Sequence, residues 1–212
     1  MKAATKLYDV IRLDHFRGFE AYWEVPYGAE SARGGKWVKG PDMKFIEAIQ
    51  KALPQKAFIA GDLGVITPEV RKMKEASGFP GMAVMEFAFA SRTPSSYLPH
   101  NHTPNTVCYV GTHDNPSMAQ WLRESDPDCK AYATEYMGLS ETEGLVWGTI
   151  RTALSSVANL CILQMQDLLG VKARMNLPGS FGAPNWCWRM GADGLDDRIA
   201  DKLFHMTKLY ER

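Results

Sequence analysis

The sequence lacks the features that would assign it directly to several common function classes. Its 24 basic and 24 acidic residues give a formal net charge of zero, which argues against a nucleic-acid backbone or an anionic membrane as the main partner. No apolar run approaches the roughly 20 residues that a membrane helix needs, and the first residues do not form the apolar core of a signal peptide. We therefore expect a cytoplasmic protein with a neutral or small polar ligand, and neither nucleic acid nor membrane as a partner.

Paired cysteines and phosphate-binding loops are also lacking. The four cysteines stand far apart with no CxxC pair, which argues against a zinc site or a disulfide scaffold and favours reduced thiols. The glycine-rich stretches GFPGM and ARGGKW have neither the GxGxxG nor the Walker spacing, so a nucleotide-binding fold is not indicated. No repeat or low-complexity linker divides the chain, and residues 1–212 are expected to form a single domain. The cysteines are Cys108, Cys129, Cys161 and Cys187.

The sequence does contain an alternation of short apolar runs and helical patterns. The runs resemble strands buried on both faces of a sheet. The alternation predicts an α/β protein with a parallel sheet, and without a phosphate loop a (β/α)8 barrel is favoured over an open nucleotide-binding sheet. The predicted strands are Val10–Leu13, Phe58–Ala60, Ala83–Phe89, Thr106–Val110 and Leu160–Leu163, and the predicted helices are Met43–Leu53, Pro68–Ala76, Ser117–Arg123, Glu143–Val157 and Asp196–Tyr210.

Two of these helices have clear start signals. Thr67 can cap a helix that has Pro68 at its first position and stops at Gly78. Ser140 and Glu143 have the spacing of a capping box.

Polar residues follow the predicted strands, at the positions where barrel enzymes carry their chemistry. Asp14 follows the first strand and Asp114 follows the strand at 106–110, so we expect the two carboxylates to face each other across one mouth. Arg12 lies on the same side of its strand as Asp14 and can keep that carboxylate ionised. An ionised nucleophile, a proton donor and groups that grip hydroxyls are what retaining glycoside chemistry needs. Aromatic residues suited to stacking on sugar faces are Tyr22, Trp23, Trp37, Trp121, Trp186 and Trp188.

Spacing alone also allows a structural interpretation. An Asp-His pair is more often a structural hydrogen-bonding pair than a catalytic one, and most tryptophans of a globular chain belong to its core. The segment His100-Asn101-His102 is more typical of an exposed loop than of a metal site. From spacing alone, a carbohydrate enzyme and a purely structural arrangement both stay open.

Eight motifs, in order along nearly the whole chain, resemble the second half of the 4-alpha-glucanotransferases, also called amylomaltases or disproportionating enzymes. The resemblance implies a partial (β/α)8 TIM barrel of the α-amylase superfamily, made of strands four to eight with their helices. It also implies transfer of an α-1,4-glucan segment, through a covalent glycosyl-aspartate, to the 4-hydroxyl of glucose or another glucan. Maltooligosaccharides would be substrates, and no cofactor would be needed. The motifs are YDVIRLDHFRGFEAYWEVP, GKWVKGP, IAGDLGVITPEV, GFPGMAVMEFAF, YLPHN, YVGTHDN, QDLLG and ARMNLPGSFGAPNWCWR.

The resemblance also assigns roles to particular residues. It makes Asp14 the nucleophile and Arg12 its electrostatic partner. It implies that His113 and Asp114 bind hydroxyls of the sugar at the cleavage point, with Asp114 favouring the distorted, oxocarbenium-like form. The further residues that it places near the glucan groove are His15, Trp23, Asn115, Asn185 and Trp186.

The chain departs from the family pattern in three places. Gly61 stands where the family has the glutamate that acts as general acid and base, and Asp62 is no obvious substitute because strand alternation turns it away. Cys187 stands where an arginine is usual. The chain also starts just before the fourth barrel strand, so we expect the first three strands to be missing and the ending LYER to be a natural terminus.

These departures leave several functions open. The leading prediction is a 4-alpha-glucanotransferase impaired by truncation and by the loss of its acid/base. The alternatives are a non-catalytic α-glucan-binding protein and a fragment without function. A plain α-glucan hydrolase also stays open, because transfer and hydrolysis differ only in whether a sugar hydroxyl or water reaches the glycosyl-enzyme first.

Overall fold

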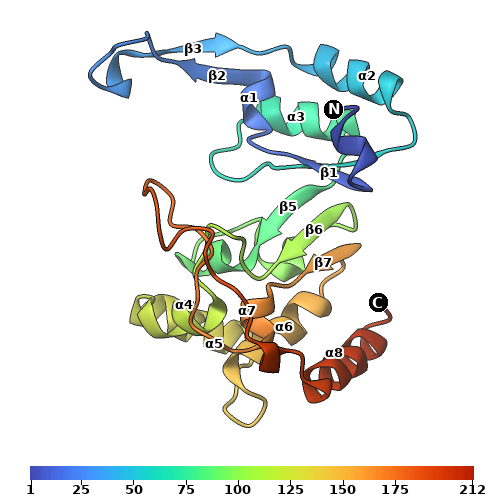
Figure 1. Cartoon of the computed structure of the whole chain (residues 1–212), viewed down its shortest axis with the longest axis vertical. Helices are drawn as coiled ribbons and strands as arrows, with labels where there is room; N and C mark the ends of the chain where they lie inside the picture. Colours follow the sequence, from blue (N-terminus) through green and yellow to red (C-terminus); the bar gives the residue numbers. More distant parts are fainter. The chain divides into compact units, whose positions relative to one another are not determined.

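The structure, a computed structural model, describes all 212 residues and divides into two compact units, residues 1–82 and 83–212 (Figure 1). The chain passes from the first unit to the second within strand β5, Gly81–Val84. Both units combine helices with short strands, so the α/β class predicted from the sequence is confirmed. That the units form a single domain stays a prediction.

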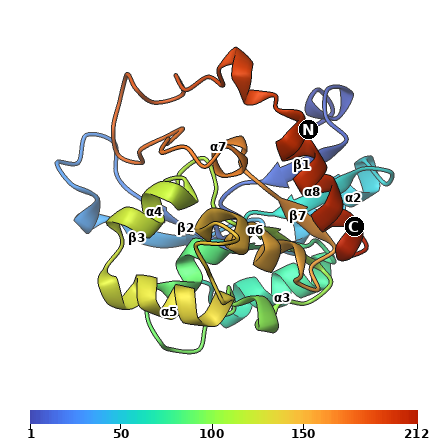
Figure 2. The same ribbon diagram turned by 90° about the horizontal axis from the view of Figure 1, so that it is seen from below.

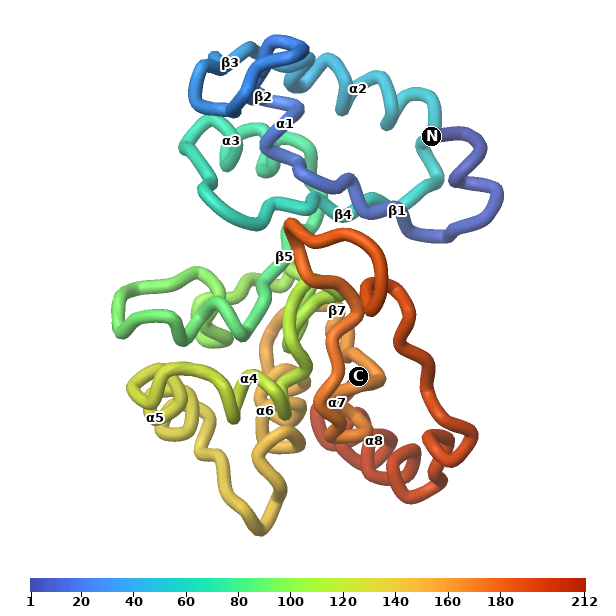
Figure 3. The backbone as a smooth tube through the Cα atoms, turned by 60° about the vertical axis from the view of Figure 1, so that its left-hand side comes forward, coloured from blue at the N-terminus to red at the C-terminus, as the bar shows by residue number.

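The first unit is built on a pair of parallel strands and an antiparallel hairpin. Strand β1 pairs with β4 in a register that sets Leu13 beside Ala60, and the hairpin sets Trp23 beside Trp37. Figure 1 shows the hairpin extending from α1 on the side away from α2, and Figure 3 shows the same unit as a backbone tube. The elements are η1 (Ala4–Lys6), β1 (Val10–Leu13), α1 (Arg17–Glu20), β2 (Ala21–Glu24), η2 (Ala32–Gly34), β3 (Lys36–Lys39), α2 (Met43–Ala52), β4 (Ala57–Ala60) and α3 (Pro68–Ser77).

The helix that follows β4 begins and ends where the sequence predicts. The Thr67 hydroxyl accepts a hydrogen bond from the Val70 N–H, and Pro68 occupies the first helical position. Gly78 ends the helix in the left-handed conformation at φ 69°, which a side chain would strain.

The core of the first unit joins the parallel strands to α2 and α3. Leu13 of β1 and Phe58 of β4 pack with Ile46 of α2 and Met73 of α3 in one buried cluster. The parallel strands are thus covered by helices, as βαβ units require. This packing fixes where β1 and β4 end, and those ends carry the candidate residues of this unit.

The second unit holds a three-stranded sheet in the order β5-β6-β7, in which β6 and β7 are parallel. In Figures 1 and 2 helices α4 to α7 gather around this sheet, and α8 runs beside α6. After the short strand β5, the elements are η3 (Met85–Phe89), η4 (Pro99–Asn101), β6 (Thr106–Tyr109), α4 (Met118–Glu124), α5 (Pro127–Met137), α6 (Leu145–Leu154), β7 (Leu160–Ile162), α7 (Met165–Leu168), η5 (Ala192–Gly194) and α8 (Asp197–Leu209).

Two predicted elements of this unit are corrected. The strand predicted over Ala83–Phe89 ends at Val84 and continues as the 3-10 helix η3. The reason is visible in the packing, because Met85, Ala88 and Phe89 enter one buried cluster at helical rather than alternating spacing. This correction places Glu86 on a helical turn.

The helix predicted over Glu143–Val157 is also shorter than predicted and spans Leu145–Leu154. Ser140 does accept a hydrogen bond from the Glu143 N–H, but the helix begins only at Leu145, after Gly144 at φ 90°. The Glu143 carboxylate does not complete a capping box and binds Arg151 instead, at 2.9 Å. The pairing of Glu143 with Arg151 therefore takes the place of the second half of the predicted capping box.

Strands β2 and β3 and helices α1, α5 and α7 were not predicted from the sequence. The β2–β3 hairpin pairs two exposed segments across a long connection. Helix α5 starts at Asp126 and Pro127 and ends at Gly138, which are ordinary start and stop residues.

None of the helices has both the length and the apolar composition needed to cross a membrane. All four cysteines are free.

Candidate active-site residues

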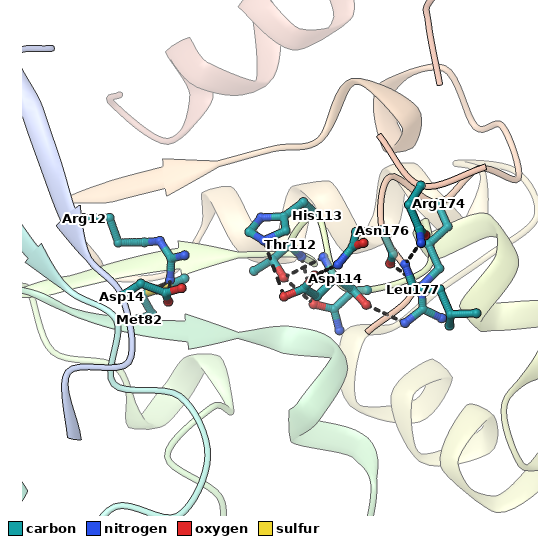
Figure 4. A network of polar contacts seen from close by, with 11 residues as sticks. Arg12, Asp14, Met82, Thr112, His113, Asp114, Arg174, Asn176 and Leu177 are labelled. Carbon is teal, nitrogen blue, oxygen red and sulfur yellow. Dashed lines mark hydrogen bonds and ion pairs between the residues drawn. The ribbon is translucent and has the colours of Figure 1, made fainter. Parts of the chain in front are cut away.

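The turn after β1 presents the first candidate carboxylate. Asp14 lies one residue beyond the strand with 76% of its side chain exposed, and its Oδ1 is 2.7 Å from Nη1 of Arg12. The two side chains are drawn as one pair in Figure 4. Arg12 is partly covered by the protein and also reaches the Met82 sulfur at 3.7 Å. The predicted Arg12–Asp14 pair is therefore formed, with the carboxylate open to solvent.

The backbone of Gly61 is hydrogen-bonded to the residues on both sides of this turn. Its N–H donates to the Leu13 carbonyl at 2.8 Å, and its carbonyl accepts from the Phe16 N–H at 3.0 Å. The turn that carries Asp14 and His15 is thus tied at both ends to one residue of the neighbouring strand. His15 lies exposed within the turn at φ 46°.

The space beside Gly61 is too small for a side chain in this conformation. A Cβ on Gly61 would lie 2.8 Å from the Leu13 carbonyl oxygen, 3.0 Å from Arg12 Nη1 and 3.2 Å from the Asp14 Cα. Two of these three atoms belong to the backbone, which cannot rotate away. The glycine therefore lets the ends of β1 and β4 approach closely.

Asp62 has a structural role. Its side chain is 6% exposed, and it accepts hydrogen bonds from Lys74 Nζ and from the Met82 N–H, both at 2.7 Å. These bonds tie the loop after β4 to helix α3 and to strand β5. The prediction that Asp62 turns away from the side of Gly61 agrees with these contacts.

The hairpin carries the aromatic candidates of the first unit. The rings of Trp23 and Trp37 meet edge to face with centroids 5.5 Å apart, and both side chains are exposed. The Trp23 indole N–H donates to the Ala32 carbonyl at 2.8 Å, and the Arg17 guanidinium lies over the Trp37 ring at 4.4 Å. Such a ring surface can stack on an apolar sugar face.

The turn after β6 presents the second candidate carboxylate. Asp114 accepts from the Asn176 side-chain N–H at 2.7 Å through Oδ1, and its Oδ2 lies 3.4 Å from His113 Nε2. Arg174 donates to the backbone carbonyl of Asp114 and to that of Asn176. Figure 4 shows these contacts converging on Asp114. The carboxylate is held by a network from the segment that follows α7.

Asn115 fixes the backbone of the same turn. Its Oδ1 accepts from the Thr112 N–H at 3.0 Å and from the Thr112 hydroxyl at 2.8 Å. Asn115 is buried, so its contacts organise the turn. The expectation that Asn115 binds glucan stays a prediction.

The two candidates near residue 186 differ in exposure and in contacts. Trp186 is largely exposed, and its ring lies 5.2 Å from the His113 imidazole. The Asn185 carboxamide is used within its loop, where it accepts from the Leu177 N–H and donates to Ser180. Cys187 is exposed.

Two buried carboxyl groups lie beneath the Asp114 turn. Burial, together with the negative charge of Asp167, raises the pKa of Glu86 to about 9, against the smaller opposing effects of Asn115 and Arg174. Burial raises the pKa of Asp167 to about 6, while its hydrogen bond from the Met118 N–H at 2.6 Å acts in the opposite direction. The burial of Glu86 therefore favours its neutral form.

Reasoning from the sequence missed three residues of this arrangement. Arg174 and Asn176 lie in a stretch without regular secondary structure, far from Asp114 in sequence, so no spacing connects them to it. Glu86 lies within the segment 83–89 that the sequence predicts as a strand, so it was not considered among the residues at strand ends. A charged residue between Met85 and Phe87, within an apolar run, was the signal for a buried acid.

An α/β framework with acidic residues just beyond strands β1 and β6 is typical of the enzymes that place their chemistry at strand ends. Comparison with known proteins makes this class specific, because a family model described as 4-alpha-glucanotransferase matches residues 1–193. The chain belongs to the 4-alpha-glucanotransferase family.

Individual relatives agree over the whole chain. The 4-alpha-glucanotransferase of Clostridium butyricum is 45% identical over 215 residues, covering 100% of this chain and 44% of the relative. That of Arabidopsis thaliana is 40% identical and is covered to 38%. The structure of an amylomaltase from Streptococcus agalactiae in complex with acarbose aligns with a TM-score of 0.94 at 36% identity, over 100% of this chain and 43% of that one. The chain thus spans less than half the length of these relatives.

Proposed function

We propose that this chain provides the nucleophile and part of the sugar-binding machinery of a 4-alpha-glucanotransferase that acts on α-1,4-glucans. The observation that carries the proposal is the Arg12–Asp14 pair at the end of β1, in a chain that matches the family over its whole length. A solvent-exposed carboxylate paired with a guanidinium is suited to attack an anomeric carbon.

In the proposed first step, Asp14 attacks the anomeric carbon of the donor sugar. A bond forms between its Oδ and that carbon, and the bond to the leaving-group oxygen breaks. Asp114, His113 and Trp186 bind the sugar at the cleavage point, the first through its hydroxyls and the last by stacking. The oxygen of the 4-hydroxyl of glucose or of another glucan then bonds to the anomeric carbon as the bond to Asp14 Oδ breaks, the hydroxyl proton passes to solvent, and the α-configuration is retained.

The weak point of this chemistry is proton supply at residue 61. A sugar leaving group needs a proton, and a positioned general acid contributes about 10²- to 10⁴-fold in rate, or roughly 3 to 5 kcal/mol. Gly61 has no proton to give, and the carboxylate of Asp62 is bound to Lys74 and Met82. We therefore infer that donors whose leaving group needs no proton react far better than glucans.

The finer fold proposal is that β1 and β4 to β7 correspond to strands four to eight of a (β/α)8 barrel. The parallel pairs β1-β4 and β6-β7 support this assignment. It is also supported by the length of the chain, which covers less than half of the Clostridium butyricum enzyme, as a partial barrel would. An activity test therefore combines the chain with the part of the Clostridium butyricum enzyme that the match does not cover.

The experiment compares two donors on this combined protein. α-Maltosyl fluoride is expected to give a glycosyl-Asp14 adduct, detected as a mass increase on the peptide that contains Asp14. Maltotriose is expected to turn over at least about 10²-fold more slowly than the fluoride. Equal turnover of both donors would mean that another residue supplies the proton, and absence of an adduct at Asp14 would reject the proposed nucleophile.

A second candidate is a glucan-binding protein without catalysis. The exposed Trp23–Trp37 pair and the supported Asp114 favour binding, while Gly61 disfavours turnover. Isothermal titration with maltoheptaose, run beside the fluoride experiment, separates the two. Binding without an adduct from the fluoride selects the second candidate.

A further inference from the structure

Three buried polar atoms without a hydrogen-bond partner come from residues grouped around the end of β6. They are Oε1 of Glu86, Nε2 of Gln164 and Oδ2 of Asp167. Glu86 is 4% exposed and Asp167 is fully buried. Buried polar groups without partners are uncommon and call for a physical explanation.

Gly111 shows how closely these groups approach the backbone. A Cβ on Gly111 would meet both Glu86 Oε1 and Gln164 Nε2 at 2.9 Å, and the Asn115 Cβ at 3.2 Å. The carboxyl oxygen and the amide nitrogen therefore occupy the place that a side chain at position 111 would fill. The Glu86 N–H also donates to the Val110 carbonyl at 3.2 Å, so η3 is tied to the end of β6.

These groups lie directly under the turn that carries the candidate sugar ligands. The Glu86 Oε1 and the Asn115 Cβ both lie around the point where a Cβ of Gly111 would stand, at 2.9 and 3.2 Å from it, so the Asn115 side chain adjoins the Glu86 carboxyl group. Because Asn115 uses Oδ1 for the Thr112 N–H and hydroxyl, its amide hydrogens are the atoms available to Glu86. Glu86 thus adjoins Asn115, and Asn115 is hydrogen-bonded to Thr112. His113 and Asp114 lie in the sequence between Thr112 and Asn115.

We propose that Glu86 is a positioning residue whose buried, neutral carboxyl group fixes Asn115 and thereby holds the Thr112–Asn115 turn in the geometry that presents His113 and Asp114. A neutral acid has one O–H donor and a carbonyl acceptor. Oε1 of Glu86 and Nε2 of Gln164 both adjoin position 111, and Asp167 lies near enough for its charge to act on Glu86. An ionised Glu86 would instead place two negative charges together, with Arg174 as the compensating cation.

The charge state of Glu86 is tested by stability against pH, with Glu86→Gln as the isosteric neutral variant. The charged groups that face Glu86 are Asp167 and Arg174, and both are kept in the variant. Since the folded pKa is about 9 and the ordinary value is 4.5, the unfolded chain loses this proton first as pH rises. The stability associated with the proton is fully present below 4.5 and is lost progressively up to about 9.

The expected result is that Glu86→Gln raises the urea midpoint relative to the unmodified chain by an amount that grows from pH 5 to pH 9. The matched control is Glu141→Gln, an exposed glutamate of the same unit, for which the difference should stay constant. Infrared spectra at pH 7.5 should show a protonated carboxyl band that Glu86→Gln removes and Glu141→Gln keeps. A pH-independent difference for Glu86→Gln, or no such band, overturns the neutral state.

The positioning role is tested by hydrogen exchange of the Thr112 amide, whose N–H donates a hydrogen bond to Asn115 Oδ1. In Glu86→Leu, which keeps the volume but not the polar contact, this amide should exchange about tenfold faster. It should stay close to the unmodified rate in Glu86→Gln. The Cys108 amide within β6 serves as the internal control, because a general loosening of the fold would accelerate both amides. Equal acceleration of both, or of neither, rejects the positioning role.

Only the consequence for sugar binding rests on the proposed function. If the unmodified chain binds maltoheptaose, Glu86→Leu should weaken binding about tenfold while Glu86→Gln does not. If the unmodified chain binds no glucan, the proposed function fails, whereas the exchange and pH results still decide the role of Glu86.

Discussion

The two turns that carry the candidate carboxylates are built in different ways. After β1, Asp14 projects into solvent beside Arg12, and its turn is tied to the backbone of Gly61. After β6, Asp114 is bound by Asn176 and lies above buried carboxyl groups. The first arrangement leaves a charged oxygen free to react. The second fixes a carboxylate in one direction, as a group that must bind particular hydroxyls requires.

The largest expected effect contrasts the two carboxylates directly. In the combined protein, Asp14→Asn should lower the rate of adduct formation from α-maltosyl fluoride by more than about 10⁴-fold, because it removes the attacking oxygen. Asp114→Asn should lower it by about 10² to 10³-fold, because it removes only stabilisation of the transition state. Single-turnover kinetics of both variants measure the contrast, and equal losses would contradict the division of roles.

The next effect concerns the glycine beside Asp14. Gly61→Glu should raise maltotriose turnover by about 10²- to 10⁴-fold and leave the fluoride reaction little changed. The same change should destabilise the chain by about 1 to 3 kcal/mol, because the new Cβ meets the Leu13 carbonyl.

Gly61→Ala is the control for that change, since it adds the Cβ without the acid. Gly61→Ala should lower the free energy of unfolding measured in urea, and it should leave the rate of maltotriose turnover unchanged. A gain with alanine would mean that the backbone shift, and not the carboxyl group, restores activity.

A smaller effect tests the structural role of Asp62. Asp62→Ala should destabilise the chain by about 2 to 4 kcal/mol, because it leaves Lys74 and the Met82 N–H without their acceptor. Asp62→Asn should cost less, because it keeps an oxygen for Met82. Neither should change the ratio of fluoride to maltotriose rates in the folded protein, and a change in that ratio would identify Asp62 as a proton donor.

The smallest effect concerns the support of Asp114. Asn176→Ala removes one hydrogen bond to its carboxylate and should weaken maltoheptaose binding by about 1 kcal/mol, or roughly fivefold. Asn185→Ala, whose contacts lie within its own loop, is the comparison and should affect loop order more than affinity. Titration calorimetry on both variants measures the difference.

The secondary structure was predictable wherever local signals agree with the packing. Helix α3 illustrates this, since Thr67, Pro68 and Gly78 act within a few residues of one another. Segment 83–89 shows the opposite case. An apolar run there is compatible with strand or helix, and only the burial of Met85 with Ala88 and Phe89 selects a helical turn.

The sequence by itself determined the parallel α/β class and the family, and it identified Arg12, Asp14, His113 and Asp114 as candidates. These follow from periodicity and from motifs whose residues are close in sequence. Only the tertiary structure decided that Arg174 and Asn176 hold Asp114, that Asp62 is bound to Lys74, and that Glu86 is buried beneath the turn. The physical reason is that hydrogen bonding and desolvation depend on distances between residues far apart in the chain, which no local pattern contains.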